Sequence, residues 1–177
     1  MRIIAGTNKG RALKAPTWEG LRPTSDKLRE TLFNIVAPRI AGARVLDVFA
    51  GTGAVALEAL SRGAMAATCV EQDRRAVQLM EDNRERCGAA DRCVIIRDAV
   101  ERALSRPVPG GPFDVIVLDP PYAYAALADV VAAAATQRAE GAVLVLEHAS
   151  RVTPPAPPGL VVARTVKSGD SALTFYQ

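Results

Sequence analysis

From Ala43 onward, short apolar segments alternate with longer segments of helical spacing, and this alternation constrains the fold more than any other feature. The run Phe113–Leu118 is apolar except for Asp114, as expected of a strand that is buried on both faces. Strands that alternate with helices form a parallel sheet with helices on both faces. The sequence therefore predicts an α/β fold.

The predicted strands of this region are Arg44–Phe49, Ala67–Glu71, Cys93–Arg97, Phe113–Leu118 and Ala142–Glu147. The predicted helices between them are Ala54–Arg62, Arg74–Cys87, Val100–Leu104 and Tyr124–Gln137. Two further strands, Leu160–Val166 and Ala172–Tyr176, flank the turn residues 168–171. We expect them to form a hairpin that places one antiparallel strand in the sheet.

Residues 1–40 are predicted to form a basic extension that packs on an α/β domain of residues 41–177. Two short strands are expected within Arg2–Ala15, around turn residues 7–10. Thr24 or Ser25 can then cap a helix, which Pro38 ends.

The positive charge of the chain is concentrated in this extension. Residues 1–39 hold eight Lys and Arg against three acidic residues, whereas the remainder has 14 basic and 16 acidic residues. A basic segment on a near-neutral body suits a polyanion, although it is also typical of a solvated face. The candidate RNA-binding residues are Arg2, Lys9, Arg11, Lys14 and Arg22.

Cysteine content and the length of the apolar runs restrict the cellular compartment that we expect for this protein. Cys69, Cys87 and Cys93 are too few and too scattered for a disulfide framework or a zinc site, so we expect buried thiols and no metal. The apolar runs are shorter than the ~20 residues of a membrane span, and the start has no signal-peptide core. These features favour a cytoplasmic protein, and we expect a monomer.

A glycine turn follows the first predicted strand of the sheet. The segment 45–53 leads from apolar residues into Gly51 and Gly53, where backbone can approach a ligand closely. Asp47 and Phe49 do not belong to the nicotinamide-binding fingerprint, and an acid suits the ammonium group of an amino-acid cofactor. We predict that these four residues bind a cofactor.

Acidic residues also follow the next two predicted strands. Glu71 lies twenty residues after Gly51 and can accept hydrogen bonds from ribose hydroxyls. Asp98, with the adjoining Ala99, lies at the matching position and can accept from an adenine amino group. Asp98 is equally well placed to cap a helix. The ribose contact alone does not separate nicotinamide from adenosylmethionine.

The tetrapeptide Asp119-Pro120-Pro121-Tyr122 follows the fourth predicted strand of the sheet. Asp119 and the Pro120 carbonyl can accept the two N–H groups of an aromatic amine and orient its lone pair. The prolines fix φ and remove N–H donors, while Tyr122 offers a stacking face for an extruded base. This pattern predicts methylation of an exocyclic amine on a base.

The tetrapeptide resembles the signature of amino-methyltransferases that act on nucleic-acid bases. The chain further resembles the bacterial RsmD family in segments 2–6, 9–11, 21–24, 29–34, 57–64 and 173–176. That resemblance implies a Rossmann-like class I fold with a seven-stranded sheet and S-adenosylmethionine as donor. It also implies guanine-N2 methylation of 16S rRNA in the small ribosomal subunit or its assembly intermediate. Lys167-Ser168-Gly169 departs from the expected aromatic before the glycine.

Three other functions remain open at this stage. A DNA adenine-N6 methyltransferase would share the tetrapeptide, and a nicotinamide-dependent oxidoreductase would share the glycine turn. A non-catalytic RNA-binding module would need no cofactor pocket. For His148 we expect a surface position, and Trp18 is suited either to stack on a base or to cover the sheet edge.

Overall fold

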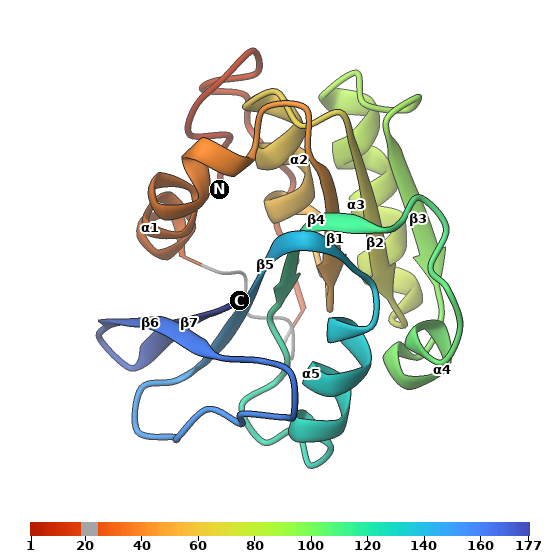
Figure 1. Ribbon diagram of the computed structural model, residues 1–177. Helices are drawn as coiled ribbons and strands as arrows, with labels where there is room; N and C mark the ends of the chain where they lie inside the picture. The colour runs from red at the N-terminus through yellow and green to blue at the C-terminus, as the bar shows by residue number, and fades with distance from the viewer. Residues whose placement is uncertain (19–24) are drawn as a thin grey trace.

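The computed structural model describes residues 1–18 and 25–177. Its centre is a seven-stranded sheet of strand order β3-β2-β1-β4-β5-β7-β6 (Figure 1). The strands are β1 (Arg44–Val48), β2 (Ala66–Glu71), β3 (Cys93–Arg97), β4 (Phe113–Leu118), β5 (Arg138–Ala149), β6 (Val162–Ser168) and β7 (Ser171–Tyr176).

The strand directions confirm the predicted fold. β1 pairs in parallel with both β2 and β4, and β4 pairs in parallel with β5. β7 is antiparallel to its neighbours β5 and β6. The chain runs outward from β1 to β3 and then returns to β4 on the other side of β1. The strand order therefore reverses between β1 and β4, which is where open α/β sheets bind ligands.

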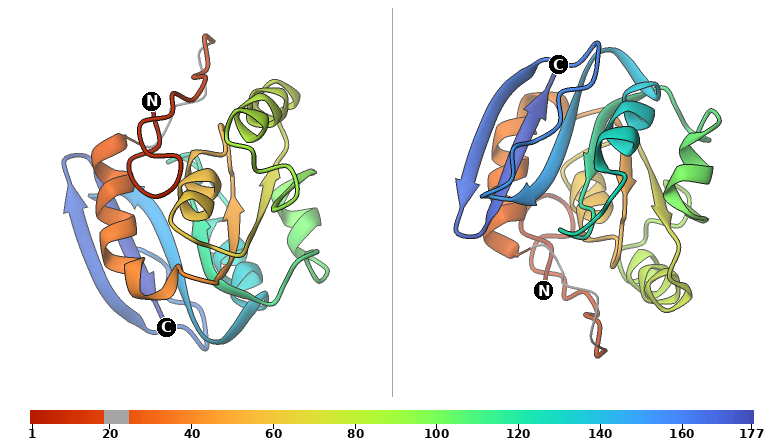
Figure 2. Two further views of the ribbon diagram at one scale, coloured as in Figure 1. Left: turned by 90° about the horizontal axis from the view of Figure 1, so that it is seen from above. Right: turned by 90° about the horizontal axis from the view of Figure 1, so that it is seen from below.

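Helices cover both faces of the sheet, and the sheet separates the core into two layers (Figure 2). On one face, α1, α2 and α3 enclose a cluster that includes Phe33, Leu57 and Met80. On the other face, α4 and α5 pack over Ile116, Leu144 and their neighbours. The helices are α1 (Asp26–Val36), α2 (Ala54–Ser61), α3 (Arg74–Arg86), α4 (Val100–Leu104) and α5 (Leu127–Ala135), with a 3-10 turn η1 (Ala37–Arg39).

Two further predictions are confirmed, a cap at the start of α1 and the burial of the cysteines. The Ser25 hydroxyl caps α1 by accepting the N–H of Leu28 at 3.2 Å. All three cysteines are buried free thiols, as expected. In the described part of the chain, no helix is both long enough and apolar enough to cross a membrane.

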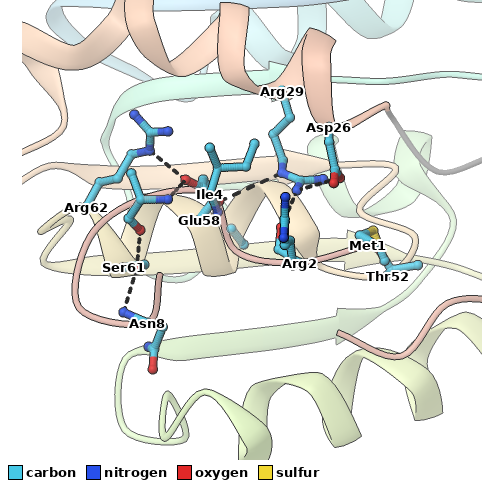
Figure 3. Close-up of polar contacts among 12 residues, drawn as sticks. Met1, Arg2, Ile4, Asn8, Asp26, Arg29, Thr52, Glu58, Ser61 and Arg62 are labelled. Atoms are coloured by element: carbon cyan, nitrogen blue, oxygen red, sulfur yellow. Dashed lines mark hydrogen bonds and ion pairs between the residues drawn. The ribbon is translucent and has the colours of Figure 1, made fainter. Parts of the chain in front are cut away.

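The predicted strand pair at the N-terminus forms only as a single antiparallel bridge, between Arg2 and Ala12. The N–H of Ile3 donates to the Arg11 carbonyl at 3.0 Å, and the N–H of Leu13 donates to the Met1 carbonyl at 3.2 Å. The N–H groups of Ile4 and Ala5 instead donate to the Glu58 carboxylate at 2.7 and 3.0 Å (Figure 3). A side chain of α2 thus takes the N–H groups that follow the bridge, and the pairing does not extend into two full strands.

Several C-terminal predictions also need correction. α5 begins three residues later than expected, because the N–H of Tyr124 donates to the Pro121 carbonyl in a turn. β5 runs longer than expected at both ends, and its pairing with β7 reaches Ala149. His148 is therefore buried at 4% exposure rather than on the surface, and its Nε2 lies 2.8 Å from the Thr174 hydroxyl.

Candidate active site

The candidate site lies at the carboxyl ends of β1 and β4, where the strand order reverses. The backbone N–H of Asp119 donates to the Val48 carbonyl at 3.2 Å, which fixes the start of the tetrapeptide beside the end of β1. Asp47, at the end of β1, interacts electrostatically with both Asp119 and Glu71. Three predicted site carboxylates, distant in sequence, thus converge on one edge of the sheet.

The glycine turn leaves β1 in a conformation that few side chains tolerate. Phe49 has φ +63°, and Gly51 and Gly53 have φ +52° and +74°. A Cβ on Gly53 would lie 2.6 Å from Cγ of Met80 in α3, so a side chain has no room there. α2 begins directly after Gly53, and its first N–H groups therefore face the carboxyl edge of the sheet.

Glu71 holds this turn in place. Its Oε2 accepts the N–H of Gly51 at 2.9 Å, and its Oε1 accepts the N–H groups of Gln72 and Asp73 at 2.8 and 2.9 Å. The carboxylate is 8% exposed, and three of its roughly four acceptor sites are used, which leaves about one for a ligand. Glu71 therefore shapes the backbone of the glycine turn, in addition to the ribose contact that the sequence predicts.

Asp47 is almost fully buried, with 2% exposure, and its Oδ2 accepts the N–H of Ala56 at 3.1 Å. Burial raises its pKa to about 8, and the nearby Asp119 and Glu71 contribute to that rise against the Ala56 hydrogen bond. A buried carboxyl among other carboxylates gains most from a cationic ligand, which would stabilise its charged form. The donor set therefore fits a cofactor with an ammonium and a sulfonium charge.

Asp98 makes different contacts from those of a helix cap. It accepts the N–H of the adjacent Ala99 at 2.8 Å, and it forms ion pairs with Arg102 and Arg106 of the following segment. The Arg102 guanidinium beside it holds the pKa of Asp98 below its usual value. The capping alternative is not realised, because the helix cap position is Ala99.

The tetrapeptide presents its residues in graded exposure. Asp119 is partly exposed and Pro120 is buried, while Pro121 and Tyr122 are exposed. The Tyr122 hydroxyl lies 2.6 Å from the hydroxyl of Ser171, the first residue of β7. With 45% of its surface exposed, Tyr122 has ring area available for a flat ligand.

Tyr124 is a site residue that the sequence reasoning missed. Its ring packs edge-on against Phe49, with centroids 5.0 Å apart, and its hydroxyl donates to Glu101. Burial and then this hydrogen bond raise the pKa of Tyr124 to about 12, so the hydroxyl stays protonated. An aromatic residue two positions after Tyr122 was the available signal. Tyr124 joins the tetrapeptide loop to the glycine turn.

The basic N-terminal residues divide into two groups. The Arg11 guanidinium donates to the Arg86 carbonyl, and Lys14 pairs with Asp82 at 2.5 Å, so both hold the segment on α3. Arg2 and Lys9 are exposed and line a groove of about 440 Å³ with Lys27. Arg22 lies outside the described residues.

Trp18 of the N-terminal segment lies beside α3. The Arg75 guanidinium of α3 lies over its ring, 5.0 Å from the centroid. A second groove, with a volume of about 380 Å³, lies at the start of β5. It is at the opposite edge of the sheet from the candidate site, and Arg39, Arg138 and Glu140 line it.

A family model described as "Conserved hypothetical protein 95" matches residues 1–177. The chain belongs to this family. Relatives include "Ribosomal RNA small subunit methyltransferase D" of Escherichia coli K12, 43% identical over 122 residues that cover 69% of this chain and 60% of that protein. "Putative rRNA methyltransferase YlbH" of Bacillus subtilis is 41% identical over 69% of this chain and 67% of that protein.

These relatives confirm the resemblance to the RsmD family. The matched part of the chain spans about 60% of the length of the Escherichia coli relative. Among solved structures, the Escherichia coli protein named "Putative methyltransferase yhhF" superposes with a TM-score of 0.86 and 35% identity, over 100% of this chain and 97% of that one. A hypothetical protein of Thermus thermophilus gives a TM-score of 0.81 at 32% identity, over 99% and 98%.

In this RsmD-family chain, the tertiary structure unites residues that the sequence singled out separately. Asp47, Gly51, Glu71 and Asp119 lie together across the β1–β4 switch. Asp98 lies beside them because its N–H donates to the Glu71 carbonyl at 3.1 Å. The predicted RNA-binding residues Arg11 and Lys14 do not contact these residues. Their side chains bind Arg86 and Asp82 of α3 instead.

Proposed function

We propose that this protein transfers a methyl group from S-adenosylmethionine to the exocyclic N2 of a guanine in 16S rRNA of the small ribosomal subunit. One observation supports this proposal above the others: the Asp-Pro-Pro-Tyr tetrapeptide is tied by its first N–H to the end of β1, beside the buried Asp47. The tetrapeptide offers hydrogen-bond acceptors for an amine, and the buried carboxyl beside it favours a cationic ligand. Together they suit the methylation of an amine. The N-terminal resemblance and the relatives' names favour ribosomal RNA over DNA.

The residues of the switch would hold the cofactor as follows. Asp47 faces the ammonium group, Glu71 accepts from the ribose, and Asp98 with Ala99 lies beside the adenine. Gly51 and Gly53 permit close approach of the ligand, and Phe49 borders it. S-adenosylmethionine supplies an electrophilic methyl group on a sulfonium.

The tetrapeptide would hold the target base. Asp119 and the Pro120 carbonyl accept the two N–H groups of the guanine amine, which directs its lone pair toward the methyl carbon. Tyr122 stacks on the extruded base. As the nitrogen lone pair forms the bond to the methyl carbon, the bond from that carbon to sulfur would break and neutral S-adenosylhomocysteine would leave. Asp119 would stabilise the positive charge that develops on the nitrogen. The surplus proton then leaves the product nitrogen for solvent, so the site needs no strong base.

The N-terminal segment would contact the RNA backbone. Arg2 and Lys9 are exposed beside the groove, where phosphate oxygens can reach them. Arg11 and Lys14 already bind α3, so their main role is to anchor the segment. We therefore assign residues 1–40 as the RNA-facing extension and residues 41–177 as the methyltransferase domain.

Labelled S-adenosylmethionine tests the assignment. Wild-type protein is incubated with small subunits that lack this methylation, with naked 16S rRNA and with duplex DNA. We expect label in the ribosomal substrates, and a loss of about 10- to 100-fold in rate for Asp119→Ala, which removes a charge-assisted hydrogen bond. Asp129→Ala, an exposed carboxylate of α5, is the matched control. Label in DNA alone, or full turnover by Asp119→Ala, would contradict the assignment.

A further inference from the structure

The buried side chain of Asn83 connects the N-terminal segment to the glycine turn. Asn83 of α3 is 0% exposed, and its Oδ1 accepts the N–H of Lys14 at 2.7 Å. Its Nδ2 donates to the carbonyls of Lys14 and Thr52, both at 3.1 Å. Both amide donors and the amide oxygen are thus used, and each bond ends on backbone. A buried amide with every bond satisfied fixes the relative position of the groups it joins.

Asn83 is the central contact of a longer row. Asn8 donates to the Cys87 carbonyl at 3.1 Å, Arg11 binds the Arg86 carbonyl, and the Trp18 ring lies under Arg75. The segment therefore follows α3 from its C-terminal end toward its N-terminal end. This row aligns the basic segment with the helix that also supports the cofactor turn.

The glycine turn contacts the segment and α3 together. Thr52 lies between Gly51 and Gly53, and its hydroxyl is 3.7 Å from the sulfur of Met1 (Figure 3). Met80, one helical turn before Asn83, occupies the space where Gly53 would need a Cβ. The segment therefore contacts Thr52 twice, at its carbonyl through Asn83 and at its hydroxyl through Met1, directly beside the proposed cofactor site.

We propose that Asn83 is a positioning residue that couples RNA binding by residues 1–18 to cofactor binding by the glycine turn. The inference rests on the proposed function. RNA contacts at Arg2 and Lys9 restrict the motion of the segment, and Asn83 transmits this order to the Thr52 carbonyl. Binding of one ligand orders this region, and the second ligand then binds with a smaller loss of conformational entropy. By thermodynamic linkage, the coupling is reciprocal.

Equilibrium dialysis of labelled S-adenosylhomocysteine measures this coupling. The affinity is determined with and without saturating small subunits that lack the methylation. For wild-type protein we expect the subunits to tighten binding about 5-fold or more, within the usual range of such couplings. Asn83→Ala is expected to reduce the ratio to less than about 2-fold and to weaken binding of S-adenosylhomocysteine alone by about 5-fold, an effect size within the same range.

Ser61→Ala is the matched control. The Ser61 hydroxyl donates to the Ala5 carbonyl at 2.6 Å and accepts the N–H of Asn8 at 3.0 Å, so its removal also loosens the segment. Ser61 belongs to α2, and these two bonds hold the segment at a distance from Lys14 and without involving Thr52. This variant should bind subunits less tightly while it retains the coupling ratio, which a general loss of stability would not preserve.

A second pair of variants tests the same bond without a change to α3. Lys14→Pro removes the N–H that donates to Asn83, whereas Lys14→Ala removes only the side chain that pairs with Asp82. The coupling should fall in the first and persist in the second. If wild-type protein binds S-adenosylhomocysteine without any coupling, or if Asn83→Ala and Lys14→Pro retain it, this inference is wrong. If wild-type protein does not bind S-adenosylhomocysteine, the proposed function itself fails.

Discussion

At the scale of single residues, Asp47 gives the clearest test of the site's electrostatics. Its folded-state pKa of about 8 lies above the usual value near 3.8. Between these values the folded protein holds a proton that the unfolded chain releases, so stability falls as pH rises. The proton is retained because a buried charge next to Asp119 and Glu71 is costly in the absence of a cation.

Asp47→Asn removes this titration while retaining an acceptor for the Ala56 N–H. We expect the difference in unfolding free energy, in favour of the variant, to widen from pH 5 to pH 8 by up to roughly 1.4 kcal/mol per pH unit. Thermal melts of both proteins at matched pH values measure it, because groups common to both cancel. A difference that does not vary with pH would show that Asp47 is ionised throughout. The variant should also bind S-adenosylmethionine more weakly than wild type.

At the scale of elements, the N-terminal segment depends on a buried charged group for its attachment. Glu58 of α2 is fully buried and accepts the N–H groups of Ile4 and Ala5 and the Nε–H of Arg62. Its Oε2 also lies 3.9 Å from Nε of the fully buried Arg29 (Figure 3). Removal of one partner from such a cluster leaves buried donors facing no acceptor.

Glu58→Gln replaces one of these oxygens by a donor and removes the charge opposite Arg29. We expect a loss of about 3 kcal/mol in unfolding free energy, which corresponds to a decrease of roughly 6–12 °C in Tm. Differential scanning calorimetry gives the value, with Asp82→Asn in the exposed pair with Lys14 as the control. Equal, small shifts in the two variants would mean that the segment is not anchored through Glu58.

The helices and strands also differ in how well the sequence predicts them. Arg44–Val48 and Cys93–Arg97 were predictable because apolar runs and flanking glycines are local signals. The N-terminal strands shorten to one bridge, and the predicted surface position of His148 was wrong, because long-range partners decide both. Glu58 supplies the acceptors for the first, and β7 extends over the second.

The candidate site shows the same division. Asp47, Glu71 and Asp119 each lie at or just after the end of a strand, so the sequence indicates that they share the carboxyl edge of the sheet. Nothing in the sequence around Asn83 shows that a polar residue of an amphipathic helix would bind two distant backbone segments. Tyr124 was missed because the alanine-rich segment after it predicts a helix that begins at this residue.

At the scale of the whole molecule, three exposed basic residues meet at the N-terminal groove. Arg2, Lys9 and Lys27 line it together with Asp26 and Glu30. Phosphate contacts release counterions, and the affinity of a protein for RNA therefore falls with salt in proportion to the number of contacts.

The double variant Arg2→Ala/Lys9→Ala should bind 16S rRNA with a salt dependence reduced by about 1.4–2 in log–log slope, because two phosphate contacts are lost. Filter binding over a range of salt concentrations measures the slope. Lys14→Ala, whose ammonium already pairs with Asp82, should change it less. An unchanged slope in the double variant would place the RNA on another face of the molecule.

The identity of the modified nucleoside decides whether this protein methylates guanine N2 of 16S rRNA. Small subunits that lack the methylation are treated with the protein and deuteromethyl-labelled S-adenosylmethionine, and their 16S rRNA is digested to nucleosides for mass spectrometry. We expect labelled N2-methylguanosine, strongly reduced with Asp119→Ala. Label in N6-methyladenosine, or no label in the RNA of subunits that the protein binds, would contradict this expectation.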